Sequence, residues 1–363
     1  MGARASQPYE IKERIDGKTV IVTGCNTGIG KPTAQEFYRV GGRVIMACRD
    51  VYKAKQAADE IRREVELSFP HDKAGKLIVK KLDLSSLESI RNFVDDVNDS
   101  EDQINILVNN AGVMSPSRQT TADGFELTFG TNYLGHFYLT LLLLPKILAS
   151  APARIVNVSS LAYEYGRIHW DDLGLERNYG MFRAYSQSKL ANILFTRELA
   201  SRLDGSGVTA YAVHPGMIST ELTRFTDKYY ILTPVKKCLS HLWSRVHTNV
   251  LEGAATSLYC ALDESIATES GFYYRDCARK ELAPHALSED DAKKTMGLIS
   301  DIGGTRRVPG EGQQSRWSPN SCSIVSRRFL SFDGCLKSKF TTFHDVSSSI
   351  LRQRPRRRAQ IHE

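Results

Sequence analysis

Two side chains near the middle of the chain could move a proton. Tyr185 and Lys189 are four residues apart within residues 183–203, where apolar residues recur at helical spacing. Residues four apart share one face of a helix, so the phenol and the ammonium group should lie side by side. A nearby positive charge favours the phenolate, and such a tyrosine can exchange a proton with a carbonyl or alcohol oxygen. The same spacing is also common on solvated helix faces.

A glycine-rich segment near the N-terminus could hold a phosphate. Residues 18–24 form a short β-branched run ending in glycine, which is typical of a buried parallel strand. The letters TGCNTGIG at 23–30 follow, and then a helical stretch. Glycines let a pyrophosphate approach the backbone, and the N–H groups that begin a helix attract the anion. This order predicts a dinucleotide site; the alternative is a structural turn.

The ends of the next strands indicate which dinucleotide. Arg49 closes the second predicted strand, where a site for NAD usually has an acidic side chain. A guanidinium suits a 2′-phosphate, which favours NADP(H), although Arg49 could be only a solvated charge. Asp83 could meet an adenine edge or cap the next helix. The small residues and amides of NNAG at 109–112 would let a flat cofactor lie close to the chain.

Strands and helices alternate along the chain, which predicts an α/β fold: one Rossmann-type domain with a doubly wound parallel sheet of about seven strands. The predicted strands cover residues 18–24, 43–49, 76–84, 104–113, 154–160, 209–216 and 271–274. Besides the helix after Gly30, the predicted helices cover residues 53–67, 87–97, 183–203, 251–262 and 289–300. Between Ser160 and Tyr185 we expect a loop with a short helix.

Composition limits the class of protein. The chain has 363 residues, 41% of them hydrophobic, enough for one large core. No apolar run reaches membrane-spanning length, and residues 1–18 are too polar for a signal peptide. The seven cysteines have neither zinc nor disulfide spacing, so we expect reduced thiols, no metal site and no secretion. His136, His169 and His214 are interpreted as core or capping residues.

The net charge of +7 belongs to the C-terminal end. Residues 303–363 hold 12 Lys and Arg against 4 Asp and Glu, so the rest of the chain is nearly neutral. We predict an N-terminal extension (1–17), the folded domain (18–301) and a disordered basic tail (302–363). The arginine run near the end could bind a polyanion; a tail without a selected role is preferred, and no nucleic-acid partner is expected. Gly2 fits the N-myristoylation pattern, but a plain disordered start is preferred.

In order, the motifs resemble those of the short-chain dehydrogenase/reductases. They are TGCNTGIG at 23–30, NNAG at 109–112, Asn132 in GTNYLGHF, IVNVSS at 155–160, YSQSK at 185–189, and HPG at 214–216 followed by Thr220. Intervening segments such as MACRD and SKLANILFTRELASRL look like the retinol dehydrogenase branch. The resemblance covers roughly residues 15–301.

The resemblance implies site residues and a reaction. Tyr185 would be the acid/base, Ser160 would bind the substrate oxygen, and Lys189 would lower the pKa of Tyr185. Asn132 would support a water that links Lys189 to solvent. The cofactor positions would be Thr23, Gly24, Asn26, Gly28, Ile29, Gly30, Arg49, Asp83, Asn110, Ala111, Gly112, Tyr185, Lys189, Pro215, Gly216 and Thr220. With NADP(H), the enzyme would interconvert a lipophilic aldehyde or ketone, such as retinal, and its alcohol.

Several alternatives stay open. Residues 217–250, which cover the substrate in this family, are aromatic and apolar with interspersed Lys and Arg, so they suit a lipophilic carbonyl or contact with a membrane surface. The same chemistry could act on a steroid, quinone or xenobiotic carbonyl, or the chain could be a cofactor-bound, non-catalytic interaction protein. A homodimer would be common in the family. We expect a cytoplasmic location or a peripheral one on an intracellular membrane.

Overall fold

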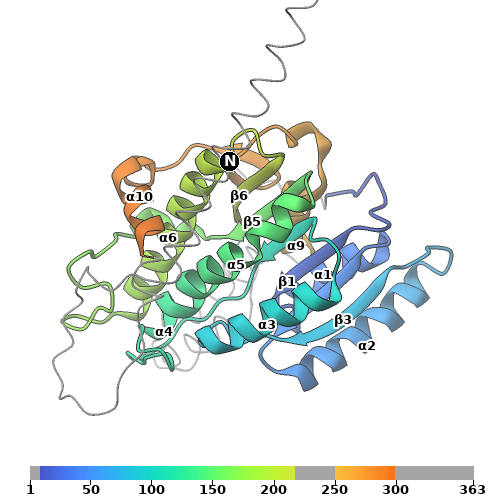
Figure 1. The fold of residues 1–363 in the computed structure, drawn as a ribbon, viewed down its shortest axis with the longest axis horizontal. Coiled ribbons are helices and arrows are strands. Elements are labelled where there is room, and N and C mark those ends of the chain that lie inside the picture. The colour runs from blue at the N-terminus through green and yellow to red at the C-terminus, as the bar shows by residue number, and fades with distance from the viewer. Residues whose placement is uncertain (1–8, 217–249, 299–363) are drawn as a thin grey trace, which may run out of the picture. The chain divides into compact units, whose positions relative to one another are not determined.

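The computed structural model describes residues 9–216 and 250–298. The chain divides into a compact unit of residues 1–296, which contains the sheet, and a second unit of residues 297–363. The sheet has eight strands in the order β3-β2-β1-β4-β5-β6-β7-β8, and only the last pair is antiparallel (Figure 1). The predicted doubly wound α/β fold is confirmed. The strands are β1 (Thr19–Thr23), β2 (Arg43–Cys48), β3 (Lys76–Lys81), β4 (Ile106–Asn109), β5 (Ala153–Val158), β6 (Val208–His214), β7 (Tyr273–Arg275) and β8 (Ala278–Lys280).

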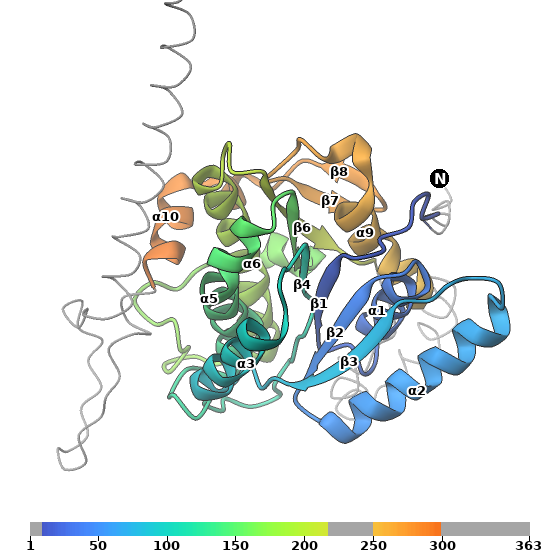
Figure 2. The same cartoon turned by 45° about the vertical axis from the view of Figure 1, so that its right-hand side comes forward.

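Helices cover both faces of the sheet (Figure 2). One face carries α1 (Gly30–Arg39), α2 (Val51–Ser68) and α9 (Val250–Leu262), and the other carries α3 (Leu87–Ser100), α5 (Gly135–Ala149) and α6 (Met181–Arg202). The shorter helices are α4 (Leu127–Phe129), η1 (Gly130–Leu134), η2 (Leu161–Tyr165), η4 (Glu264–Ile266), η5 (Pro284–Leu287) and α10 (Glu289–Gly297). The central strands are buried on both sides, which explains why they are continuous apolar runs without alternation.

The structure differs from the prediction at the end of the fourth strand and in one strand that was not predicted. The fourth strand ends at Asn109, because the backbone N–H of Asn110 turns away to donate to the Thr23 hydroxyl. The unpredicted strand β8 pairs with β7 through a two-residue turn, in which Asp276 and Cys277 have φ values of 53° and 52°. The loop with a short helix predicted between Ser160 and Tyr185 is confirmed: the helix is η2, and residues 166–180 contain no helix.

One helical turn of the chain is wider than the rest. η1, which lies between α4 and α5, is a π-helix, and all five of its residues are buried. Asn132 is at its centre and has no exposed surface. Short π-helical segments often occur at functional sites, and here the widened turn sets the direction in which Asn132 leaves the helix.

The order of the strands positions the site. The chain runs outward in one direction from β1 to β3 and in the other from β4 to β7, so the switch point lies between β1 and β4. In open parallel sheets, ligands bind outside the carboxyl ends of the strands at such a switch point. Most of the predicted cofactor residues lie in the loops that follow β1 to β6, whereas Asn132 lies in η1 and Tyr185 and Lys189 lie on α6.

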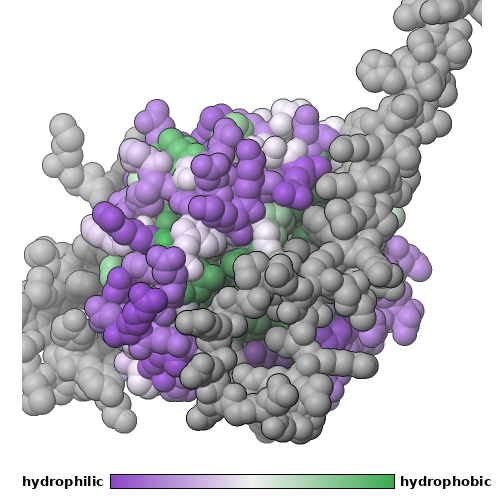
Figure 3. Space-filling model, turned by 60° about the vertical axis from the view of Figure 1, so that its left-hand side comes forward, coloured by the Kyte–Doolittle hydropathy of each residue, from purple (hydrophilic) through white to green (hydrophobic). Residues whose placement is uncertain are grey.

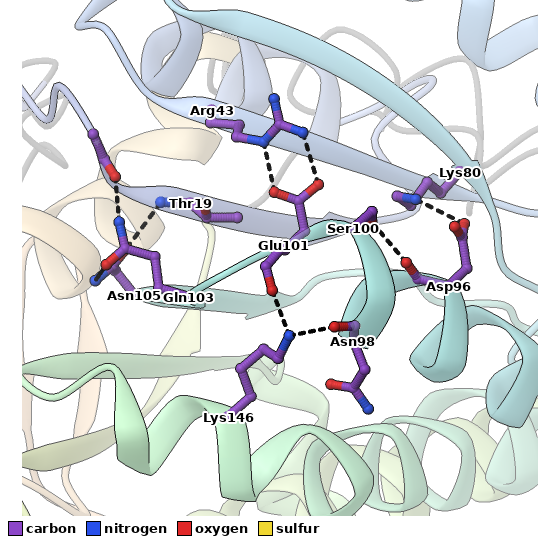
Figure 4. A network of polar contacts seen from close by, with 11 residues as sticks. Thr19, Arg43, Lys80, Asp96, Asn98, Ser100, Glu101, Gln103, Asn105 and Lys146 are labelled. Carbon is purple, nitrogen blue, oxygen red and sulfur yellow. Dashed lines mark hydrogen bonds and ion pairs between the residues drawn. The ribbon is translucent and has the colours of Figure 1, made fainter.

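Polar residues secure the opposite, amino end of the sheet (Figure 4). The Arg43 guanidinium donates two hydrogen bonds, of 2.5 and 2.9 Å, to the carboxylate of Glu101, which is 4% exposed. This partner raises the pKa of Arg43 above its ordinary value. The Lys146 ammonium donates to the backbone oxygens of Asn98, at 2.8 Å, and of Glu101. The network joins β2, the end of α3 and α5.

Replacing Glu101 with alanine is expected to destabilise the fold without changing the site. The change removes a charge-assisted pair and leaves Arg43 without its carboxylate, so the free energy of unfolding should fall by about 1–3 kcal/mol. Chemical denaturation measures this, with the exposed neighbour Asp102→Ala as the matched control. If Glu101→Ala were as stable as the wild type, the assigned role would be wrong.

One face of the described residues is mainly hydrophilic. On the face drawn in Figure 3, hydrophilic side chains cover most of the described part, with hydrophobic ones visible between them. Among the large hydrophobic residues that are exposed, Tyr165 and Phe182 have their rings 6.0 Å apart. Within residues 9–216 and 250–298, no helix has both the length and the apolar character needed to cross a membrane.

Candidate active site

The loop after β1 forms a cradle in which side chains have no room. Gly24 has a φ of +62°, and a Cβ atom there would lie 2.8 Å from the Cβ of Ala111. A Cβ atom on Gly30, the first residue of α1, would lie 2.7 Å from the backbone oxygen of Gly24. Both glycines are therefore required by close approach, and Gly28 also has a positive φ of 57°. The loop leads into the N-terminus of α1, as a pyrophosphate site requires.

Thr23 and Asn110 hold the ends of β1 and β4 together. The buried Thr23 hydroxyl accepts hydrogen bonds from the backbone N–H groups of Asn110, at 2.9 Å, and Ala111, at 3.0 Å. The Asn110 amide donates to the backbone oxygens of Thr23 and Gly24. The Asn110 side-chain amide, which was predicted to lie beside a cofactor, thus bonds to the protein backbone and fixes the shape of the cradle.

Arg49 and Asp50 follow β2 and differ in how they are engaged. Asp50 caps α2, since its carboxylate accepts a 3.0 Å hydrogen bond from the backbone N–H of Lys53. Arg49 is exposed and has no hydrogen bond or ion pair with another described residue. The carboxylate is occupied locally, whereas the guanidinium is available to an anionic ligand.

Asp83, after β3, does not cap the next helix. Its carboxylate accepts hydrogen bonds from the backbone N–H and the hydroxyl of Ser85, at 2.9 and 2.6 Å, and Ser86 is the residue that caps α3. Of the two interpretations offered by the sequence, the helix cap is wrong. Asp83 is half-buried at the carboxyl edge of the sheet, where contact with an adenine stays a prediction.

The two serines after β5 have different roles. The hydroxyl of Ser159 is buried and donates a 2.8 Å hydrogen bond to the backbone oxygen of Lys189, so it attaches α6 to the sheet. Ser160 is half-buried, caps η2 through the backbone N–H of Ala162, and forms a hydrogen bond with Tyr185. Only the second serine reaches the phenol, as the motif resemblance implies.

Tyr185 and Lys189 lie together on α6. The Lys189 ammonium is 5.5 Å from the centre of the Tyr185 ring and donates a 2.9 Å hydrogen bond to the backbone oxygen of Val158. Lys189 is 3% exposed and Tyr185 is half-buried. The helical spacing of four residues thus brings the two groups together as predicted.

Burial determines the proton affinities of this pair. It lowers the pKa of Lys189 to about 8, because water no longer solvates the ammonium. It raises the pKa of Tyr185 to about 12, although the hydrogen bond with Ser160 acts in the opposite direction. Burial is thus the larger influence on the Tyr185 pKa here, and a lowering of that pKa by Lys189 stays a prediction.

Asn132 bridges two walls of the site. Its amide accepts from the backbone N–H of Val113, at 2.8 Å, and donates to the backbone oxygen of the same residue, at 2.9 Å. It also donates to the Ser188 hydroxyl on α6, at 3.1 Å. A Cβ atom on Gly112 would lie 3.7 Å from both the Asn132 amide oxygen and the Lys189 nitrogen, so Gly112 lies between these two side chains.

The remaining predicted residues lie along the same edge. Asn26 is half-buried in the glycine loop, and Ile29 is the residue before α1. Pro215 is buried directly after β6, and Gly216 follows with a φ of +90°. Thr220 and most of the predicted substrate cover, residues 217–249, lie outside the described residues.

Two residues that support the site through hydrogen bonds, His136 and Ser188, were not predicted from the sequence. His136 hydrogen-bonds to Thr23 and to the backbone oxygen of Asn132, and Ser188 joins Asn132 to α6. One signal was available, because His136 is four residues after Asn132 and so lies on the same helix face. Its bond to Thr23, 113 residues away, could not be read from spacing.

Comparison with known proteins agrees with this architecture. A family model for short chain dehydrogenases matches residues 18–230. Retinol dehydrogenase 12 of Homo sapiens is 46% identical over 293 residues, covering 81% of this chain and 88% of that protein. Retinol dehydrogenase 13 of Homo sapiens is 48% identical over 284 residues, covering 78% and 83%.

A solved structure agrees as well. An uncharacterized protein from Mycobacterium paratuberculosis superposes with a TM-score of 0.62 at 34% identity, covering 80% of this chain and 94% of that one. The fold, the ordered motifs and these relatives lead to one conclusion. The chain belongs to the short-chain dehydrogenase/reductase family, in its retinol dehydrogenase-like branch, and is an oxidoreductase of the kind that uses NAD(P).

Proposed function

We propose that the protein is an NADP(H)-dependent oxidoreductase that interconverts a lipophilic aldehyde or ketone and its alcohol. One observation carries the proposal: the Ser160 hydroxyl and the Lys189 ammonium flank the Tyr185 phenol beside the glycine cradle. The relatives named retinol dehydrogenases support retinal or a similar molecule as substrate.

Each member of the site has a role in this proposal. The Ser160 hydroxyl would hydrogen-bond to the substrate oxygen and stabilise charge that develops there. Tyr185 would give a proton to that oxygen in reduction and take it back in oxidation. Lys189 would stabilise the tyrosinate and bind the ribose, and Asn132 would maintain the connection from Lys189 to solvent. The bound nicotinamide supplies or accepts the hydride.

The residues present fit an NADP(H) molecule. Gly24 and Gly30 leave space for a pyrophosphate to approach the backbone, and the Arg49 guanidinium suits a 2′-phosphate. The neighbouring Asp50 carboxylate caps α2, so it is less free to bind the ribose 2′-hydroxyl of NAD(H) than its place after β2 suggests. A homodimer, contact with a membrane surface and the domain limits at 17/18 and 301/302 stay predictions.

The pH dependence should follow Lys189. With its pKa near 8, Lys189 is charged below that pH and neutral above it, so it can stabilise the Tyr185 phenolate only while it is charged. The phenolate is the form from which Tyr185 starts in oxidation and the form it reaches in reduction. As Lys189 loses its charge, kcat/KM in both directions should therefore decline as the pH rises through about 8. Steady-state rates in both directions between about pH 6 and about pH 10 measure this.

The matched control for the pH profile is Lys189→Arg, which keeps the positive charge at every pH tested. The inflection near 8 should disappear from whatever activity the variant retains. An unchanged inflection in this variant would assign the titration to another group.

The experiment that tests the function is NADPH oxidation by the purified full chain with all-trans-retinal, decanal and a steroid ketone, repeated with NADH. Turnover of retinal with NADPH is the expected result. A preference for the steroid ketone would keep the reaction and change the substrate class. Tight NADPH binding without turnover of any carbonyl would overturn the catalytic proposal.

A further inference from the structure

A buried histidine connects the cofactor cradle to the catalytic helices. His136 belongs to α5, one turn after Asn132, and is 2% exposed. Its Nε2 atom is 2.8 Å from the hydroxyl oxygen of Thr23, and its Nδ1 atom is 3.0 Å from the backbone oxygen of Asn132. Both ring nitrogens therefore have a partner, one on each side of the site.

The contacts of Thr23 determine which nitrogen of His136 carries the proton. A hydroxyl group can accept two hydrogen bonds and donate one. Backbone N–H groups of Asn110 and Ala111 occupy both acceptor positions of Thr23. Its proton can go to Val108, whose backbone oxygen is 3.5 Å away, or to His136, at 2.8 Å, and the shorter contact is the stronger one.

His136 Nε2 is consequently the acceptor, and the proton of the neutral ring is on Nδ1. The Nδ1–H group then donates to the backbone oxygen of Asn132. Burial acts in the same direction, because it lowers the pKa of His136 to about 4 and so keeps the ring neutral. One tautomer therefore satisfies both ring nitrogens of His136 and the Thr23 hydroxyl.

The connection continues from Asn132 into α6. The Asn132 amide donates to the Ser188 hydroxyl, which in turn donates a 2.7 Å hydrogen bond to the backbone oxygen of Tyr185. His136 bonds to the backbone of Asn132 and the Asn132 side chain bonds to Ser188, so these residues together connect the cradle to the turn of α6 that carries Tyr185.

We propose that His136 is a positioning residue which, as the Nδ1–H tautomer, holds the cofactor cradle through Thr23 and the π-helical turn through Asn132. The inference rests on the proposed function for its effect on turnover. Loss of the imidazole removes one hydrogen bond from Thr23 and one from the Asn132 backbone. A variant that keeps only one of these two bonds tests one half of the link.

Two variants each retain half of the link. An asparagine amide reaches the position of Nδ1 and can still donate to Asn132, whereas a glutamine amide reaches the position of Nε2 and can still accept from Thr23. We expect His136→Asn to weaken NADPH binding about tenfold with little change in kcat, and His136→Gln to lower kcat about tenfold with little change in NADPH affinity. His136→Phe should lose both.

The control and a spectroscopic measurement complete the test. His285→Phe removes a histidine bond to the backbone oxygen of Tyr163 and should change neither quantity. In the full chain with ¹⁵N-labelled histidine, NMR should show His136 protonated at Nδ1 only. Three results would each overturn the inference. They are equal losses of NADPH affinity and kcat in both His136→Asn and His136→Gln, wild-type values of both quantities in His136→Phe, and a proton on Nε2 of His136.

The test separates this inference from the proposed function. NADPH affinity and the NMR signal do not require turnover. If the wild-type protein reduces no carbonyl, the proposed function fails. The link through His136 would still be supported by a proton on Nδ1, together with an NADPH affinity that falls in His136→Asn and is kept in His136→Gln.

Discussion

Replacing Tyr185 with phenylalanine is expected to lower kcat/KM for carbonyl reduction by about 10³-fold, because the substrate oxygen loses its proton donor. The effect should fall on kcat, since phenylalanine keeps the aromatic ring beside Lys189 and the cradle is untouched. NADPH affinity should change little. Rates with retinal and NADPH, together with NADPH binding followed by fluorescence, measure the two quantities separately.

The control for this variant is Tyr138→Phe, which removes a phenolic hydroxyl on α5 that accepts a hydrogen bond from Arg91 of α3. Its activity should match the wild type. Full reductase activity in Tyr185→Phe would show that another group gives the proton, and the mechanism proposed above would then be wrong.

Replacing Arg49 with serine should remove the preference for NADPH. A guanidinium bound to a phosphate makes charge-assisted hydrogen bonds, so their loss should weaken NADPH binding by about 10–100-fold. NADH has no 2′-phosphate, so its affinity should stay the same or improve slightly. Dissociation constants for both cofactors, measured at one ionic strength because salt screens exposed charges, give the ratio.

Arg63→Ser is the matched control, because Arg63 is also exposed but lies further along α2, away from the carboxyl edge of the sheet. It should leave both dissociation constants unchanged. If Arg49→Ser bound NADPH as tightly as the wild type, another cation would have to be responsible for any preference, and Lys53 would be the first to test.

Much of the fold could be predicted because buried parallel strands and amphipathic helices have distinct patterns. β1, β2 and β5 lie within a residue or two of their predicted limits. β8 could not be predicted, since it has three residues and two of them are charged. Its pairing depends on the turn at Asp276 and Cys277, where residues other than glycine adopt positive φ values.

For the candidate site, the sequence predicted which residues meet but not how their environment acts on them. Helical spacing was enough to bring Tyr185 beside Lys189. The upward shift in the Tyr185 pKa could not be predicted, because it depends on how much water α6 and its neighbours exclude. The roles of Ser159 and His136 were equally hidden, since their partners are backbone oxygens and a distant threonine.

The π-helical turn around Asn132 makes the length of the chain there as important as its composition. A π-helix holds one residue more than the α-helix on either side of it. Deleting one residue of 130–134 other than Asn132 would let the segment close into a regular α-helix and would change the direction in which Asn132 leaves it. Asn132 would then face away from either Val113 or Ser188. Substitutions can preserve this part of the site, whereas a one-residue deletion cannot.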